Sequence, residues 1–138
     1  MPGDSCFVDT NIWVYAHLKA KGDDRHARAL ALVSEVHDAI ISPQVIAEYY
    51  NVMLRNGRDD RWIQGNLALM FELTRLQPAN AGFVNRTIEV RNRYKFSYWD
   101  CQIVSAALLA GCATLYTEDL QSGQLIEDSL RVVNPFAA

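Results

Sequence analysis

The sequence has little that would suit a membrane protein or a secreted protein held together by disulfides. No run approaches the roughly 18 consecutive apolar residues of a transmembrane helix. The opening Met-Pro-Gly-Asp-Ser has no basic stretch before an apolar core, so we expect no signal peptide. Three cysteines without a Cys-x-x-Cys spacing argue against a disulfide framework or a zinc knuckle. We therefore expect a cytoplasmic protein with buried thiols and no membrane partner.

Several catalytic patterns are missing as well. There is no Gly-rich phosphate loop and no Gly-x-Ser-x-Gly, and His17, His26 and His37 lie at no metal-ligand spacing. The formal net charge of -3 argues weakly against a protein that wraps nucleic acid by bulk attraction. It leaves open an enzyme with a local basic surface beside an acidic, metal-filled site.

What the sequence does contain is an alternation of short apolar runs and amphipathic stretches. Half of the 138 residues are hydrophobic and 21% are charged, which is typical of a globular protein, and we expect one domain over residues 1–138. Short strands separated by helices predict an α/β fold with a parallel sheet. We expect strands at 5–8, 39–41, 74–77, 114–117 and, at an edge, 131–135. We expect helices at 12–20, 26–36, 43–55, 60–73, 79–94 and 98–110.

Four acidic residues stand where such a fold would gather them. Sites on open parallel sheets form at the carboxyl ends of strands, and Asp9 and Asp119 each follow a predicted strand. Glu48 lies less than two turns into the helix after the second strand. Asp100 is in the first turn of a helix that opens with the capping pattern Ser97-x-x-Asp100. Taken singly, each acid has a structural explanation as a cap, a turn residue or a solvated rim residue.

Taken together, the four acids point to a metal site. Carboxylates brought close together repel one another, and some would take up protons unless a cation neutralised them. Oxygen ligands of this kind suit a hard divalent ion such as Mg²⁺ or Mn²⁺. Thr10, Asn11 and Thr117 would orient the carboxylates or bind the metal's water molecules.

Four segments, in the same order along the chain, resemble the motifs of PIN-domain ribonucleases. The resemblance covers essentially the whole chain and is strongest towards the VapC-type toxins of bacterial toxin–antitoxin pairs. Any one motif is weak, but the four together are specific. The segments are Phe7-Val8-Asp9-Thr10-Asn11, Ser42 to Glu48, Trp99-Asp100-Cys101-Gln102-Ile103 and Leu115 to Leu120.

The resemblance implies a three-layer α/β/α domain that acts as a metal-dependent endoribonuclease. Asp9, Asp100 and Asp119 would bind one or two Mg²⁺ or Mn²⁺ ions, and Glu48 would bind a metal or help deprotonate the attacking water. Glu118 is an ambiguous neighbour, and we assign the ligand to Asp119 because the family's acid stands two residues after its Ser or Thr. The resemblance also implies an RNA substrate, a small antitoxin protein and a homodimer.

Cations and aromatic residues flank the acidic motifs. Arg91, Arg93 and Lys95 precede Asp100 and are candidate contacts for RNA phosphates. We expect Trp99 to belong to the core, although Tyr98 or Trp99 could stack on a base. A second basic cluster consists of Arg55, Arg58 and Arg61. Three apolar residues look exposed and would suit a partner surface, although they could also belong to the core: Trp13, Val14 and Trp62.

Two other interpretations compete with a ribonuclease. The first is a PIN-like domain that binds RNA or protein without catalysis, which the intact set of four acids disfavours. The second is a receiver-like signalling domain that binds Mg²⁺ and is phosphorylated on an aspartate. That class needs a lysine after its last strand, and no lysine follows Lys95.

Overall fold

A six-stranded sheet forms the centre of the molecule. The computed structural model describes residues 5–137, and within that range the strand order is β3-β2-β1-β4-β6-β5. Five strands run parallel, and β5 pairs antiparallel with β6. The strands are β1 (Cys6–Val8), β2 (Ala39–Ile41), β3 (Thr74–Leu76), β4 (Thr114–Tyr116), β5 (Leu125–Ile126) and β6 (Leu130–Val133).

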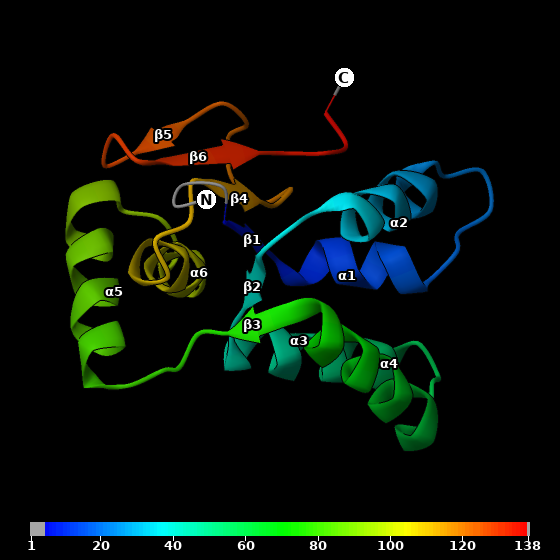
Figure 1. Cartoon of the computed structure of the whole chain (residues 1–138). Coiled ribbons are helices and arrows are strands. Elements are labelled where there is room, and N and C mark those ends of the chain that lie inside the picture. The colour runs from blue at the N-terminus through cyan, green and yellow to red at the C-terminus, as the bar shows by residue number, and fades with distance from the viewer. Residues whose placement is uncertain (1–4, 138) are drawn as a thin grey trace.

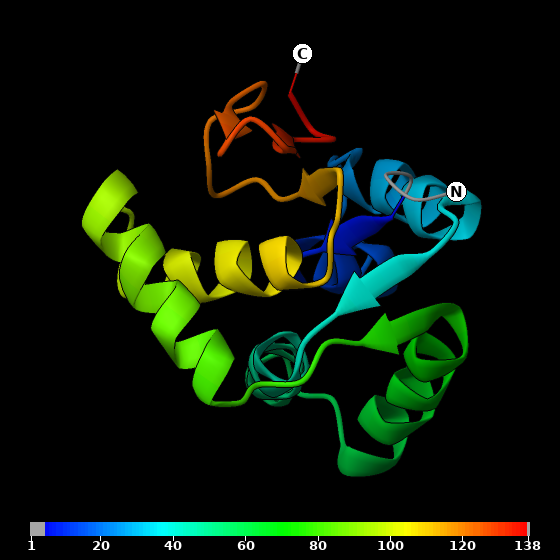
Figure 2. The ribbon, with the colours of Figure 1, turned by 60° about the vertical axis from the view of Figure 1, so that its left-hand side comes forward.

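Helices lie on both sides of this sheet, as expected for an α/β/α arrangement (Figures 1 and 2). The α5 and α6 pair packs together on one side, and α1 to α4 form a connected group on the other. β1 and β2 are buried along their whole length because both faces are covered. The helices are α1 (Thr10–His17), α2 (Arg25–Glu35), α3 (Pro43–Arg55), α4 (Asp60–Leu73), α5 (Ala81–Tyr94) and α6 (Tyr98–Leu109).

Two helix starts predicted from capping residues are confirmed, at Ser42 and Ser97, whereas the side chain of Asp24, also expected as a cap, makes no capping hydrogen bond. Ser42 precedes Pro43 and accepts a hydrogen bond from the backbone N–H of Val45, and the Ser97 hydroxyl accepts one from the N–H of Asp100 at 3.1 Å. The helix expected at 12–20 instead covers 10–17. Asp9 is the N-cap, so the helix begins two residues earlier than expected, and it ends because the backbone becomes extended at Leu18.

The end of the sheet differs from the prediction. The strand expected at the edge is β6, which lies between β4 and β5, so the edge belongs to β5. A two-residue strand after the Gly123 turn is too short to carry any periodic signal. The burial of Leu130 and Val132 on either side of exposed Arg131 is the alternation of a strand with one face in the core.

The core contains Trp13, for which the sequence left open both a partner surface and the core. Trp13 is only 1% exposed, and its indole N–H donates to the backbone oxygen of Val8 at 3.1 Å, which satisfies the one polar atom of a buried tryptophan. The cysteines Cys6, Cys101 and Cys112 are buried and free, as expected. Among residues 5–137, no helix is long and apolar enough to cross a membrane.

Candidate active site

Two of the four acids meet because the strands before them are neighbours. β1 and β4 pair in parallel with Val8 opposite Tyr116, so the residues that follow emerge at the same edge. There the Thr117 hydroxyl donates to Oδ2 of Asp9 at 2.8 Å and accepts from the N–H of Asp119 at 3.1 Å. The N–H of Thr10 donates to the other Asp9 oxygen at 2.7 Å. Asp9 is therefore held at both oxygens and is only 3% exposed.

The other two acids are brought to this edge by helices. Glu48 is half-buried on α3, where the Gln44 side-chain amide donates to its Oε1 at 2.9 Å. The same amide nitrogen lies 3.3 Å from the backbone oxygen of Trp99, at the start of α6. Gln44 thus connects Glu48 to the helix turn that carries Asp100, and the negative charge of Asp100 raises the pKa of Asp119.

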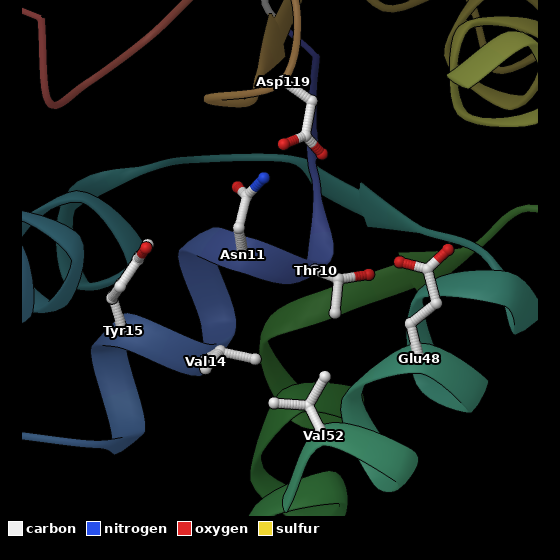
Figure 3. A pocket seen from close by; sticks show the side chains of 7 residues that line it. All are labelled: Thr10, Asn11, Val14, Tyr15, Glu48, Val52 and Asp119. Atoms are coloured by element: carbon white, nitrogen blue, oxygen red, sulfur yellow. The ribbon is translucent and has the colours of Figure 1, made fainter. Parts of the chain in front are cut away.

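A pocket of about 260 Å³ lies in front of this edge of the sheet. Figure 3 shows Asp119 pointing down towards the start of α1, with Glu48 rising from α3 across the same space. Val14 and Val52 face each other below them. The pocket is lined by Thr10, Asn11, Val14, Tyr15, Glu48, Val52 and Asp119.

The pKa shifts at this edge of the sheet are those expected of acids that lack a positively charged partner. Burial raises the pKa of Asp9 to about 7, with smaller increases from the charges of Asp119 and Glu48, although the hydrogen bonds from Thr117 and Thr10 oppose the rise. The pKa of Asp119 is also raised, first by burial and then by Asp100, Glu118 and Glu48. Asp119 is thus the acid whose charge is felt by, or which feels the charge of, each of the other three.

The oxygen atoms at this edge of the sheet are of the kind that a hard cation prefers, but the acidic side chains lie too far apart to enclose one. The hydroxyl of Thr10 and the amide oxygen of Asn11 are buried at the pocket without a hydrogen-bond partner, which is costly unless a ligand or water contacts them. Among residues 5–137, no three acidic, histidine or cysteine side chains lie close enough to enclose one ion.

Glu118, the ambiguous neighbour of Asp119, has other partners. It accepts a hydrogen bond from the Tyr15 hydroxyl at 2.9 Å and lies 3.6 Å from the Arg25 guanidinium. Arg25 in turn donates to the Tyr15 hydroxyl at 2.8 Å. Tyr15 and Arg25 had not been selected from the sequence, because nothing local connects them to a residue more than 90 positions away.

The candidate RNA contacts do not gather at the acid pocket. Arg91 donates to the backbone oxygens of Lys95 and Phe96, so it caps the end of α5. Arg93 packs over Tyr94 and lies 3.5 Å from Glu127. Lys95 is exposed in a left-handed conformation that ends the helix. None of Arg91, Arg93 and Lys95 lines the pocket that contains Glu48 and Asp119.

Trp99 corrects the sequence interpretation. It was expected in the core, but 55% of its surface is exposed. α6 is mostly apolar from Ile103 to Leu109, so its periodicity does not indicate which face of the first turn points outward. Trp99 instead lines a second hollow together with Glu48 and Arg55.

Comparisons with known proteins agree with this arrangement. The family model described as PIN domain matches residues 6–124. No curated protein sequence matches the chain. Among solved structures, the VapBC-1 structure from nontypeable Haemophilus influenzae is similar with a TM-score of 0.70 at 19% identity, covering 96% of this chain and 99% of that one.

Two further structures share the fold at similar distance. A toxin–antitoxin complex from Klebsiella pneumoniae has a TM-score of 0.69 at 19% identity and covers 96% of this chain and 99% of that chain. The toxin VapC20 of Mycobacterium tuberculosis has a TM-score of 0.67 at 21% identity and covers 83% of this chain and 91% of that chain. At these identities the similarity establishes a common fold. With a family match across most of its length, this chain belongs to the PIN domain family.

Proposed function

We propose that this chain is a metal-dependent endoribonuclease that hydrolyses RNA phosphodiester bonds, and that it is the toxin of a toxin–antitoxin pair. The observation that carries the proposal is the group of four electrostatically coupled acids, Asp9, Glu48, Asp100 and Asp119, at the sheet edge of a PIN domain. A structural neighbour, VapC20, is described as a toxin that cleaves the sarcin–ricin loop, which supports this activity class. Residues 1–138 would form one PIN domain that acts on cytoplasmic RNA.

Each residue has a defined role in this mechanism. Asp9, Asp100 and Asp119 would hold Mg²⁺ or Mn²⁺, which when bound lowers the pKa of water and stabilises charge on the scissile phosphate. Glu48 would orient the attacking water and accept its proton. Thr117 fixes the Asp9 carboxylate, and Gln44 fixes that of Glu48. Thr10 and Asn11 would donate to or accept from water in the pocket, since their oxygens have no partner in the protein.

The antitoxin would bind an apolar hollow formed by α1, α2 and α4. This hollow has a volume of about 260 Å³, and leucines on two of the helices, Leu30, Leu69 and Leu73, are about half exposed around it. Exposed apolar side chains grouped in this way are typical of protein-binding surfaces. Neighbours described as VapBC and FitAB complexes support a partner of this kind.

A homodimer belongs to the same proposal. Val84 and Ile88 lie one helical turn apart on α5 and are both nearly half exposed, which gives this helix an apolar stripe. Membership of the PIN domain family does not favour the receiver-like alternative. An inactive PIN-like domain that only binds RNA or protein is the alternative that the experiment must reject.

RNA cleavage with and without Mg²⁺ or Mn²⁺ tests the proposed activity. We expect the wild-type protein to cleave RNA with either ion and to lose activity in EDTA. Asp9→Asn and Asp100→Asn should each reduce cleavage by at least a hundredfold, because each removes one negative ligand from the metal site. Asp128→Asn, the same change at an exposed aspartate outside the pocket, is the matched control and should cleave like the wild type. Equal cleavage in EDTA, or full activity in both acid variants, would refute the mechanism.

A further inference from the structure

A second hollow adjoins the acid pocket and shares a wall with it. Glu48, Asn51, Val52 and Arg55 follow one another at helical spacing along one face of α3, and with Trp99 of α6 they enclose about 280 Å³. Glu48 and Val52 also line the acid pocket. The two hollows therefore form one path that leads from the acids, past Glu48, to Trp99 and Arg55.

The Trp99 ring is exposed, but its backbone is fixed. Its backbone oxygen is contacted by the Gln44 amide, and it lies in the first turn of α6, which Ser97 caps. A large indole held at the surface beside a polar hollow leaves apolar area in water, which burial in the core would have avoided. Such an aromatic face is a ready platform on which a planar group can stack.

Arg55 supplies the positive charge on this path. It is exposed, and none of the ion pairs found among residues 5–137 uses it, whereas Arg25, Arg28, Arg75, Arg86 and Arg93 are all paired with acids. Its position in the last turn of α3 is favourable for the helix dipole. Any position on the last turn would serve the helix dipole equally well, so the dipole does not explain why Arg55 lines the same hollow as Trp99.

We propose that this hollow binds one unpaired nucleotide of the RNA adjacent to the scissile phosphate. Trp99 stacks on the base, Arg55 contacts a phosphate, and Asn51 offers an amide to the base edge or the ribose. The inference rests on the proposed ribonuclease function and extends it to the recognition of single-stranded substrate, since a base paired in a duplex has no free face for stacking.

The test is a binding comparison with two fluorescent probes in Mg²⁺ buffer. One is a ten-nucleotide oligo(A), and the other is a chain of the same length and charge that lacks every base. Asp9→Asn serves as the background so that RNA is bound and not cleaved. Trp99→Ala should weaken oligo(A) binding roughly fivefold to a hundredfold and leave the abasic probe unchanged, because stacking requires a base.

Arg55 should behave differently, because phosphates are present in both probes. Arg55→Ala should weaken binding of both probes equally and reduce the slope of log affinity against log salt by about 0.7, the value for one phosphate on a single strand. Trp99→Phe should retain most of the affinity for oligo(A). Leu109→Ala, at the other end of α6, and Lys21→Ala are controls on the exposed surface outside the hollow, and both should bind like the background.

The outcomes separate this inference from the proposed function. If metal-dependent cleavage is present but Trp99→Ala weakens the binding of both probes equally, or of neither, the proposed ribonuclease activity is supported and the proposed nucleotide subsite is wrong. If the wild-type protein neither cleaves RNA nor, in the Asp9→Asn background, binds either probe, both proposals fail. If a purified antitoxin loses affinity on Trp99→Ala while oligo(A) does not, the hollow belongs to a protein contact and the subsite is refuted.

Discussion

Thr117 and Asp9, 108 positions apart in the sequence, are joined by a hydrogen bond of 2.8 Å from the Thr117 hydroxyl to Oδ2 of Asp9. The same hydroxyl accepts the N–H of Asp119. One threonine therefore fixes the positions of two acids at the ends of two adjacent strands. Because its hydrogen bond stabilises the ionised carboxylate, Thr117 also lowers the pKa of Asp9 against the effect of burial.

Replacing this hydroxyl should affect both stability and the pH profile. Thr117→Val leaves Oδ2 of buried Asp9 without a donor, which should cost about 1.5–3 kcal/mol in urea unfolding. The pKa of Asp9 should rise further, so the rise of metal-dependent cleavage with pH should move to more alkaline pH. Thr117→Ser keeps the hydroxyl and should resemble the wild type in both measurements. An unchanged pH profile in Thr117→Val would separate Thr117 from the function of Asp9.

The sequence predicted those parts of the molecule that depend on local signals. Ser42 before Pro43 and Ser97 before Asp100 start helices through their own side chains, so both starts were found. Short apolar runs predicted β1 and β2, which are buried on both faces. The acids could be chosen because parallel strands end at a common edge, which is a property of the topology and not of any side-chain detail.

What the sequence could not predict depends on distant partners. Glu118 is bound by Tyr15 and Arg25, and Arg91 is bound by backbone oxygens at the end of its own helix. The sequence does not show these partners, so it could not distinguish the two residues from charged residues that are free to bind a ligand. The exposure of Trp99 is set by the approach of α3 to α6 through Gln44. No periodic pattern encodes that approach.

The acid cluster should make the metal-free protein less stable as pH rises. The pKa of Asp9 is about 7 in the folded protein and about 3.9 in an unfolded chain, so between these values only the folded state holds the proton. The free energy of unfolding should therefore fall by up to about 1.4 kcal/mol per pH unit from pH 4 towards pH 7. The raised pKa of Asp119 acts in the same direction.

Asp9→Asn tests this pH dependence directly. The amide is close in size to the carboxylate and carries no charge, so in EDTA the variant should be more stable than the wild type above pH 7 and should show a flatter pH dependence. Mg²⁺ should raise the thermal midpoint of the wild type more than that of the variant, because metal binding to the folded state is stabilising. Urea unfolding in EDTA at pH 5, 6, 7 and 8 measures the stability difference and its pH dependence, and thermal unfolding with and without Mg²⁺ measures the effect of the ion. Parallel stability curves for the two proteins would contradict the pKa assigned to Asp9.

Neighbouring acids Glu118 and Asp119 should respond very differently to loss of charge. Glu118 is engaged by Tyr15 and Arg25, so Glu118→Gln should keep cleavage within about threefold of wild type. Asp119→Asn removes a proposed metal ligand and should lower cleavage by at least a hundredfold. Cleavage rates over a range of Mn²⁺ concentrations measure both, and the metal concentration for half-maximal rate should rise only in Asp119→Asn. The reverse ranking would move the ligand to Glu118.

Arg91 should prove to be a structural residue although it was selected as an RNA contact. Its guanidinium donates to the backbone oxygens of Lys95 at 2.8 Å and Phe96 at 2.6 Å, in the segment that directly follows α5. Arg91→Ala should therefore cost about 1 kcal/mol of stability, a moderate value because both carbonyls can turn to water. RNA cleavage measured well below the thermal midpoint should change by less than twofold. Asn92→Ala, at the exposed position next to Arg91 on α5, is the control and should change neither stability nor cleavage. A tenfold loss of cleavage in Arg91→Ala with little change in urea unfolding would restore Arg91 as an RNA contact, because a capping residue acts on the helix and leaves substrate binding unaffected.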